Sequence, residues 1–232
     1  MPFVWDPWPD VDVHVEWGER GAGEAADRGD DVVVVDLLRF STTVTLAAER
    51  GARVVALGRG ETPPDGTGDA LTLRPASVTA LRPGTSYTLS SFNGAAVVAA
   101  CRHAPRVTIG CLRNRSAVAA AITPDRRTTI VPCAERWSSI GAGHGIRPSI
   151  EDWLGAGAIV AATTNLRLSS EAKAAAAMFT AAGDALEQWL RQSVSGRELV
   201  AKNLADDIDP VFAIDATDTV PRLGSDGCFV AP

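Results

Sequence analysis

The fold of this chain is decided by the stretch Asp31-Val32-Val33-Val34-Val35-Asp36-Leu37-Leu38-Arg39-Phe40-Ser41-Thr42-Thr43. Four consecutive valines are typical of a strand that is buried on both faces of a parallel sheet. An acid, an arginine and three hydroxyl side chains follow the valines within eight residues, where we expect a helix to begin. Ligands of open α/β folds bind beyond the carboxyl ends of such strands. The stretch therefore offers a carboxylate for a metal, a guanidinium for an oxyanion, and free helix N–H groups for phosphate.

Segments with strand and helix patterns alternate on both sides of this stretch. Strands are expected at 32–35, 53–57, 85–90, 106–109 and 128–131, and helices at 42–50, 95–101 and 112–122. This alternation predicts right-handed βαβ crossovers and an α/β fold whose mainly parallel sheet is flanked by helices. Residues 11–17 alternate apolar with polar, which predicts a half-exposed strand at the sheet edge. The polar, glycine-rich segments 18–30 and 58–68 are interpreted as a connector and a loop.

The C-terminal third of the chain is predicted to be helical. Helices are expected at residues 150–162, at about 170–192, and after the capping box Ser195-Gly196-Arg197-Glu198. Residues 207–232 are interpreted as short strands and turns. No stretch has the composition of a linker, so we expect a single α/β domain that covers residues 1–232.

Composition narrows the classes of function. The net charge of −6 and the pI near 5.1 argue against a general nucleic-acid binder, which needs clustered cations. Cys101, Cys111, Cys133 and Cys228 lie far apart, which excludes the usual zinc spacings and argues against a disulfide framework. No apolar run reaches membrane length, and the first residues lack the pattern of a signal peptide. We therefore expect a cytoplasmic protein with neither nucleic-acid nor membrane partners.

Asp36 and Arg39 are the first candidate site residues. An acid that directly follows four valines lies at the ligand-binding edge of the sheet, although a helix-capping acid beside a surface ion pair would give the same pattern. Phosphatases of the haloacid dehalogenase type place a nucleophilic aspartate here and need a second acid two positions later, where this chain has Leu38. The sequence therefore disfavours an aspartyl-phosphate mechanism.

Polar residues follow the neighbouring strands in the same way. Ser41, Thr42 and Thr43 open a helix, where they either cap it or hold an anion together with backbone N–H groups. Asn93-Gly94 forms either a plain tight turn or a strand-to-helix turn at the ligand edge. Asn114 either caps a helix or points into the same crevice. The common position of these residues after successive strands predicts one shared crevice.

Glu151 and Asp152 open the helix that we expect at residue 150. With Ser149 as the N-cap, acids in the first turn satisfy free N–H groups and complement the helix dipole. The same placement brings either acid toward a metal or a catalytic water, and the sequence does not choose between these interpretations. Cys133 is interpreted as a core residue. His144, in a glycine-rich loop at residues 138–145, is the histidine that we would test as a base.

These motifs resemble, in their order along the chain, those of the 2-phosphosulfolactate phosphatase family. The matching segments are Val35–Thr43, Asn93-Gly94, Gly110–Asn114, Cys133-Ala134, Glu151-Asp152 with Gly155-Ala156-Gly157, and Ser195–Leu199. The resemblance implies a Mg²⁺-dependent phosphomonoester hydrolase of α/β architecture. The implied reaction converts (R)-2-phospho-3-sulfolactate and water to 3-sulfolactate and phosphate, a step toward coenzyme M.

On this hypothesis each candidate residue has a role. Asp36 and one of Glu151 or Asp152 would hold Mg²⁺, which needs few carboxylates because it keeps several waters. Arg39 would hold phosphate or another acidic group of the substrate in a bidentate contact. The predicted catalytic residues are Asp36, Arg39, Glu151 and Asp152. The predicted substrate-binding residues are Arg39, Ser41, Thr42, Thr43, Asn93, Gly94 and Asn114.

The chain departs from the family pattern at three places. Residues 61–75 lack a glycine-rich segment, Glu135 replaces a glycine, and Gly155 replaces a frequent cysteine. If the altered segment contacts substrate, we expect these departures to affect which phosphomonoester is preferred more than they affect the phosphatase reaction. The alternative function is a non-catalytic α/β protein that binds a small phosphorylated or sulfonated metabolite. Trp5, Trp8 and Trp17 suit either the core or the subunit interface of a homo-oligomer.

Overall fold

The computed structural model describes residues 10–58, 60–64, 67–137 and 145–231. Strand β2 (Asp31–Val35) lies inside a nine-stranded sheet of order β1-β7-β2-β6-β10-β11-β3-β5-β4 and is buried at every residue. Val32 and Val34 belong to the core on one face of the sheet, and Val33 and Val35 to the core on the other. The valine run therefore forms the doubly buried strand that its sequence predicts.

Seven of these strands form two parallel sets. The first set is β1 (Val13–Val15), β7 (Thr128–Pro132), β2 and β6 (Val107–Ile109), and the second is β3 (Arg53–Leu57), β5 (Ser86–Ser90) and β4 (Ala70–Leu71). The antiparallel strands β10 (Arg222–Leu223) and β11 (Cys228–Val230) join the two sets. Because all three junctions are antiparallel, the two sets run in opposite directions. The prediction of an α/β fold with a mainly parallel sheet is confirmed.

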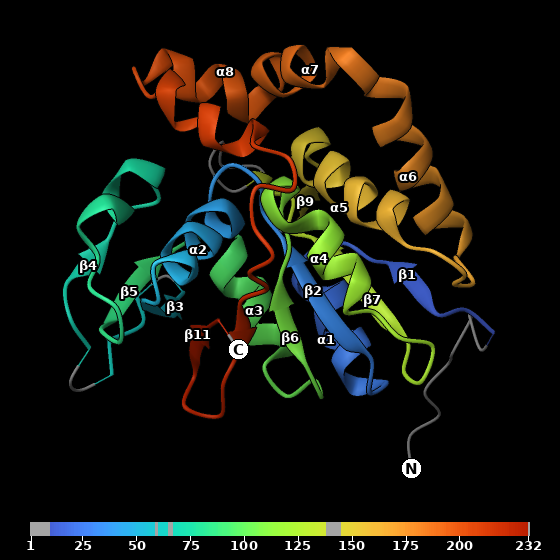
Figure 1. Cartoon of the computed structure of the whole chain (residues 1–232), viewed down its shortest axis with the longest axis horizontal. Helices are drawn as coiled ribbons and strands as arrows, with labels where there is room; N and C mark the ends of the chain where they lie inside the picture. The colour runs from blue at the N-terminus through green and yellow to red at the C-terminus, as the bar shows by residue number, and fades with distance from the viewer. Residues whose placement is uncertain (1–9, 59, 65–66, 138–144, 232) are drawn as a thin grey trace.

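Helices cover both faces of the sheet. Their bounds are α1 Gly18–Asp27, α2 Phe40–Glu49, α3 Gly94–Cys101, α4 Arg115–Ala120, α5 Ile150–Ala162, α6 Ser170–Ala182, α7 Leu186–Gln192 and α8 Val194–Ala201. Short 3₁₀ helices are η1 Pro75–Ala80, η2 Leu112–Asn114, η4 Gly183–Ala185, η5 Ala205–Asp207 and η6 Asp209–Phe212. α1 and α3 pack together on one face, while α5 packs with α4 and α6 on the other. Figure 1 shows α6, α7 and α8 as an arc along the top of the view, above α5 and α2.

The connector predicted at residues 18–30 is wrong, because residues 18–27 form α1. Gly21, Ala22, Ala25 and Ala26 are buried, and α1 packs against α3 and against the strands β7 and β2. A Cβ added at Gly23 would lie 3.8 Å from the Ala100 carbonyl oxygen of α3, which is an ordinary van der Waals contact. Such small side chains let the two helices approach closely, and tertiary packing of this kind offsets the cost of glycine in a helix.

Three smaller expectations also change. β1 lies at the sheet edge as predicted, but it is fully buried, and the His14 ring bonds to Ser169 and Glu16. The helix expected at about 170–192 is interrupted at Gly183, which has a φ of 42°, and continues as α7. The N-cap of α8 is Ser193, whose Oγ accepts a hydrogen bond from the Gly196 N–H, rather than the predicted Ser195.

Other predictions concern association and the membrane. Trp17 packs edge to face on Trp153 of the same chain, with ring centroids 5.8 Å apart, whereas Trp5 and Trp8 lie outside the described residues. Within those residues no helix combines the length and apolar character needed to cross a membrane. A single domain over residues 1–232 and a homo-oligomer stay predictions.

Candidate active site

Asp36 follows β2 directly and is the buried centre of the site. Its Oδ1 accepts a hydrogen bond from the Phe40 N–H and its Oδ2 from the Gly94 N–H, both at 3.2 Å. Phe40 begins α2 and Gly94 begins α3, so one carboxylate binds the first N–H groups of two helices. A Cβ at residue 94 would lie 2.3 Å from Phe40 Cδ1, so only glycine allows α3 to begin this close to α2. The sequence prediction that the turns after two strands meet is confirmed for Asp36 and Gly94.

Asp152 joins the ends of β2 and β7. Its Oδ1 accepts from the Leu37 N–H at 2.9 Å, and its Oδ2 from the Ala134 N–H at 3.0 Å and the Ser149 hydroxyl at 2.7 Å. These contacts fix the start of α5 against the turns that follow both strands. Since its two oxygens accept three hydrogen bonds from the protein, Asp152 acts here as an anchor, and its role as a metal ligand stays a prediction.

Two glutamates complete the group of acids at this edge. Glu151 is 2% exposed, and its Oε2 is buried without a hydrogen-bond partner among the described residues. Glu135 begins β8 (Glu135–Arg136), which pairs with β9 (Ile146–Arg147) and is separated from β7 by Cys133 and Ala134. Its carboxylate accepts from Asn93 Nδ2 at 3.0 Å and from the Ser195 hydroxyl at 3.5 Å. We call Asp36, Glu135, Glu151 and Asp152 the acid cluster.

The acid cluster holds more negative charge than the surrounding protein neutralises. None of its four carboxylates forms an ion pair with an arginine, lysine or histidine in the part of the chain that the structure describes. Burial raises the pKa of Asp36 to about 7, aided by the charges of Glu135 and Glu151 and opposed by the two N–H contacts. Burial also raises the pKa of Asp152 and of Glu135, in the latter case against the charge of Arg147, the residue opposite Glu135 in β9. Buried carboxylates in such a group need either protons or a cation.

Cys133 offers no second route to nucleophilic chemistry in the described structure. Burial raises the pKa of the Cys133 thiol well above its usual range, and the charges of Asp36 and Asp152 raise it further. The thiolate is therefore strongly disfavoured, in line with the interpretation of Cys133 as a core residue. His144 lies outside the described residues.

Arg39 lies in the turn between Asp36 and α2. Its guanidinium pairs with Asp207 of η5, a carboxylate that is 2% exposed and that also accepts from Arg74 Nε at 3.3 Å. Arg39 directly precedes Phe40, whose N–H binds Asp36. The predicted anion-binding arginine is therefore close to the acid cluster along the chain and is held by a carboxylate of its own.

The three hydroxyl residues after β2 are fully buried and bonded to main-chain groups. Ser41 Oγ accepts from the Asp36 N–H and donates to the Val34 carbonyl, and Thr42 Oγ1 donates to the Leu37 carbonyl. Thr43 Oγ1 donates to the Leu73 carbonyl. These hydroxyls fix the turn that carries Asp36 and Arg39, and their predicted contact with phosphate stays a prediction.

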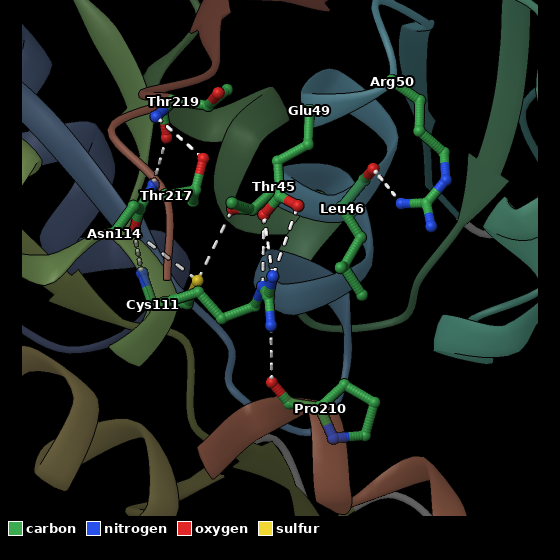
Figure 2. A network of polar contacts seen from close by, with 10 residues as sticks. Thr45, Leu46, Glu49, Arg50, Cys111, Asn114, Pro210, Thr217 and Thr219 are labelled. Atoms are coloured by element: carbon green, nitrogen blue, oxygen red, sulfur yellow. Dashed lines mark hydrogen bonds and ion pairs between the residues drawn. The ribbon is translucent and has the colours of Figure 1, made fainter. Parts of the chain in front are cut away.

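Asn114 belongs to a different network, which Figure 2 shows together with Thr45, Glu49, Cys111, Pro210 and Thr219. Its Oδ1 accepts from the Cys111 N–H, and its Nδ2 donates to the carbonyls of Ile109 and Thr219. Asn114 is fully buried, and all these partners are main-chain groups. It therefore fixes the loop after β6, and the structure does not bring its amide into contact with the acid cluster.

Sequence reasoning did not assign Glu135, Arg74 or Asp207 to the site. Glu135 carried a usable signal, because it follows β7 much as Asp36 follows β2. Asp207 carried none, because its partners lie 168 and 133 positions away in the chain.

The donor set of the acid cluster fits a hard cation such as Mg²⁺. This ion takes oxygen ligands, and it binds through one or two carboxylates while it keeps several waters. Glu151 has a buried oxygen without a partner, and each Asp36 oxygen accepts only one N–H. In the described ranges, no three His, Cys, Asp or Glu side chains are arranged as a metal site. The structure thus does not arrange Asp36, Glu151 and Asp152 as a set of three ligands, and a site with two protein ligands stays a prediction.

Two comparisons with known proteins agree. The model of the family described as 2-phosphosulpholactate phosphatase matches residues 73–226, which include Asn93, Glu135 and Glu151 but not Asp36. Over 143 residues the chain is 34% identical to a Gloeobacter violaceus protein named "Probable 2-phosphosulfolactate phosphatase". That alignment covers 61% of this chain and 57% of the relative, so the chain spans little more than half the relative's length.

Proposed function

The chain belongs to the 2-phosphosulpholactate phosphatase family, and we propose that it hydrolyses a small phosphomonoester that carries a further acidic group. The name of the Gloeobacter violaceus relative makes 2-phosphosulfolactate the first candidate substrate. The products would be 3-sulfolactate and inorganic phosphate. A link to coenzyme M synthesis and a cytoplasmic location are parts of the same proposal.

The observation that carries this proposal is the acid cluster at the carboxyl ends of β2 and β7. Four buried or half-buried carboxylates share this edge, and no described cation forms an ion pair with them. Purely structural acids are normally compensated by protein cations, because an uncompensated buried charge is costly. Perturbed pKa values in such a group are typical of functional sites.

We propose that Asp36 and Glu151 hold Mg²⁺. The bound ion would neutralise phosphoryl oxygens and lower the barrier to attack by water. Asp152 keeps the Leu37 and Ala134 backbone in place around the site. Arg39 faces a substrate anion with the guanidinium donors that Asp207 leaves unused.

Glu135 is our candidate for the group that moves a proton. Burial raises the pKa of its carboxyl group, and Asn93 and Ser195 fix its two oxygens. A carboxyl group whose pKa is raised holds its proton to a higher pH and can give that proton to the leaving alkoxide. This role gives a purpose to Glu135, which is one of the three departures from the family pattern.

The experiment that tests the proposed function is phosphate release by the purified protein, with Mg²⁺ and with EDTA. The substrate panel is 2-phosphosulfolactate, 2-phospholactate, 2-phosphoglycolate and 4-nitrophenyl phosphate. We expect Mg²⁺-dependent release that is fastest with 2-phosphosulfolactate. Binding of these esters without release of phosphate from any of them would contradict the proposal and favour the metabolite-binding alternative.

A further inference from the structure

One buried carboxylate outside the acid cluster holds two arginines. Asp207 accepts from Arg39 Nη1 through Oδ2 and from Arg74 Nε through Oδ1. The three residues come from the turn after β2, from the residue before η1, and from the end of η5. Asp207 is 2% exposed, whereas the Arg74 side chain is 47% exposed. One buried acid thus collects two cations from distant parts of the chain at one place.

These two arginines keep most of their donors unused. A guanidinium has five N–H donors, and within the described residues each of the two uses one of them, on Asp207. By contrast, Arg113 donates from Nε, Nη1 and Nη2 to Glu49 and to the Pro210 carbonyl, the contacts drawn in Figure 2. Arg113 is therefore a saturated structural arginine. The group of Arg39, Arg74 and Asp207 keeps one net positive charge and free donors.

Three connections link the segments that carry Arg39, Arg74 and Asp207 to the segments that carry the acid cluster. Arg39 is followed by Phe40, whose N–H binds Asp36. The Leu73 carbonyl, one residue before Arg74, accepts from Thr43 of the same turn. The segment that carries Asp207 follows α8, from which Ser195 bonds to Glu135. The segments that carry the two arginines are therefore tied to the segments that carry the acid cluster.

We propose that Asp207 is a positioning residue that holds Arg39 and Arg74 as a two-guanidinium subsite for the second acidic group of the substrate, a carboxylate or a sulfonate. This inference rests on the proposed function. Without Asp207, the Arg39 and Arg74 guanidinium groups would lose the buried carboxylate that holds both of them at one place. With Asp207, both arginines stay aimed at a ligand, and phosphomonoesters with a second acid are selected over those without one.

Arg74 gives the first test, with Arg126 as a matched control. Arg126 is 49% exposed and pairs with Asp31 at 3.3 Å, which closely matches the exposure and the ion-pair distance of Arg74. We expect R74Q to raise KM for 2-phosphosulfolactate about tenfold with little change in kcat, because an interaction with the ground state and the transition state alike is lost. The selectivity ratio, which is kcat/KM for 2-phosphosulfolactate divided by kcat/KM for 4-nitrophenyl phosphate, should fall at least about fivefold in R74Q. R126Q should keep both the KM and the ratio.

Asp207 gives the second test, with Asp30 as its control. Asp30 also holds two arginines, Arg28 and Arg127, but at the opposite end of β2. We expect D207N to raise KM for 2-phosphosulfolactate and to lower the same selectivity ratio, and D207E to recover part of both. D30N should lower the melting temperature without changing the selectivity ratio. A D207N variant that lost stability but kept the wild-type ratio would reduce Asp207 to a structural residue and overturn the inference.

Binding of 3-sulfolactate, measured by isothermal titration in Mg²⁺ buffer, separates the two proposals. If wild type releases phosphate but R74Q and D207N keep their KM, the subsite is wrong and the proposed function stands. If wild type releases none but binds 3-sulfolactate, and both variants bind it at least about fivefold more weakly, the subsite stands and the proposed function is wrong. If wild type neither releases phosphate nor binds 3-sulfolactate, both are wrong.

Discussion

The two ends of strand β2 carry the same kind of residue in opposite surroundings. At the amino end, Asp30 pairs with Arg28 and Arg127 and accepts from the Thr129 hydroxyl, and Asp31 pairs with two further arginines, Arg106 and Arg126. At the carboxyl end, Asp36 meets backbone N–H groups and the negative charges of Glu135 and Glu151. The same strand therefore has compensated acids at one end and uncompensated acids at the other.

This difference indicates what each end is for. Where acids only stabilise the fold, cations accompany them, because a buried charge without a partner is costly. The fold tolerates the acids near Asp36 by raising the pKa values of three of them, which leaves a place for a cation. The comparison thus supports the proposal that the amino end of β2 is structural and its carboxyl end functional, without reference to any relative.

The largest effect on activity should come from the same Asp-to-Asn substitution made in turn at the two ends of β2. D36N should reduce kcat/KM for phosphate release at least about 1000-fold, equivalent to about 4 kcal/mol, because the metal loses a ligand. D31N, on the other end of the same strand, should stay within about threefold of wild type. Mg²⁺-dependent activity that survived in D36N would remove Asp36 from the site.

The loss of stability should have the reverse order, with the larger loss from a substitution at the amino end of β2. D30N leaves Arg28 and Arg127 without their buried carboxylate, so we expect a loss of about 3 kcal/mol and a melting temperature lower by about 8 °C. D36N should lose less, because removing a negative charge from the acid cluster offsets the weakened contacts to Phe40 and Gly94. Thermal melts of both variants in EDTA check this order. An equal or larger loss in D36N would mean that Asp36 is mainly a structural acid.

The pH dependence of stability should reveal the acid cluster directly. Since the folded pKa of Asp36 is raised from 3.8 to about 7, the folded chain keeps a proton that the unfolded chain releases in this interval. Stability therefore falls as pH rises through the interval. In EDTA we expect a melting temperature about 5 °C lower at pH 8 than at pH 5.5, corresponding to about 2 kcal/mol.

Two controls sharpen the pH prediction. D36N should shrink the difference between the two melting temperatures, and Mg²⁺ should stabilise wild type more at pH 8 than at pH 5.5. Acids whose pKa values are lowered, such as Asp12 beside Arg167, act only below their ordinary values and do not contribute in this interval. A melting temperature that rose between pH 5.5 and pH 8 in EDTA would contradict the assignment.

Glu151 should give the smallest of these effects. E151Q keeps the shape of the side chain but removes the charge of the oxygen that has no partner. We expect the Mg²⁺ concentration for half-maximal activity to rise about tenfold, equivalent to about 1.4 kcal/mol, with most of kcat retained at saturating Mg²⁺. An unchanged Mg²⁺ requirement would assign the metal to other ligands.

The sequence predicts those parts of the fold whose signal is local. The valine run and the turn after it place β2, Asp36 and α2, since burial pattern, polar cluster and helix start follow each other within thirteen residues. α1 is missed because glycine and alanine are typical of a connector until α3 packs against them. The tail's position between β6 and β3 is missed because pairing of β10 and β11 depends on strands far away in the chain.

The site follows the same rule. Asp36 and Glu151 stand directly at element boundaries, so their positions are visible in the sequence. Glu135 also stands at an element boundary, but its place in the site becomes clear only in the structure, where Asn93 and Ser195 donate hydrogen bonds to it. Ser41, Thr42 and Asn114 have the composition of an anion site, yet the structure uses their side chains to fix main-chain turns. Composition alone does not distinguish these two uses of a polar side chain.

The most direct test of the central claim is isothermal titration calorimetry of Mg²⁺ binding. Mg²⁺ is titrated at pH 7.5 into metal-free wild type, D36N and D31N. The account predicts one Mg²⁺ site per chain in wild type and in D31N, and no measurable binding in D36N. Equal binding by D36N and wild type, or no binding by any of the three, would contradict the assignment of the carboxyl end of β2 as a cation site.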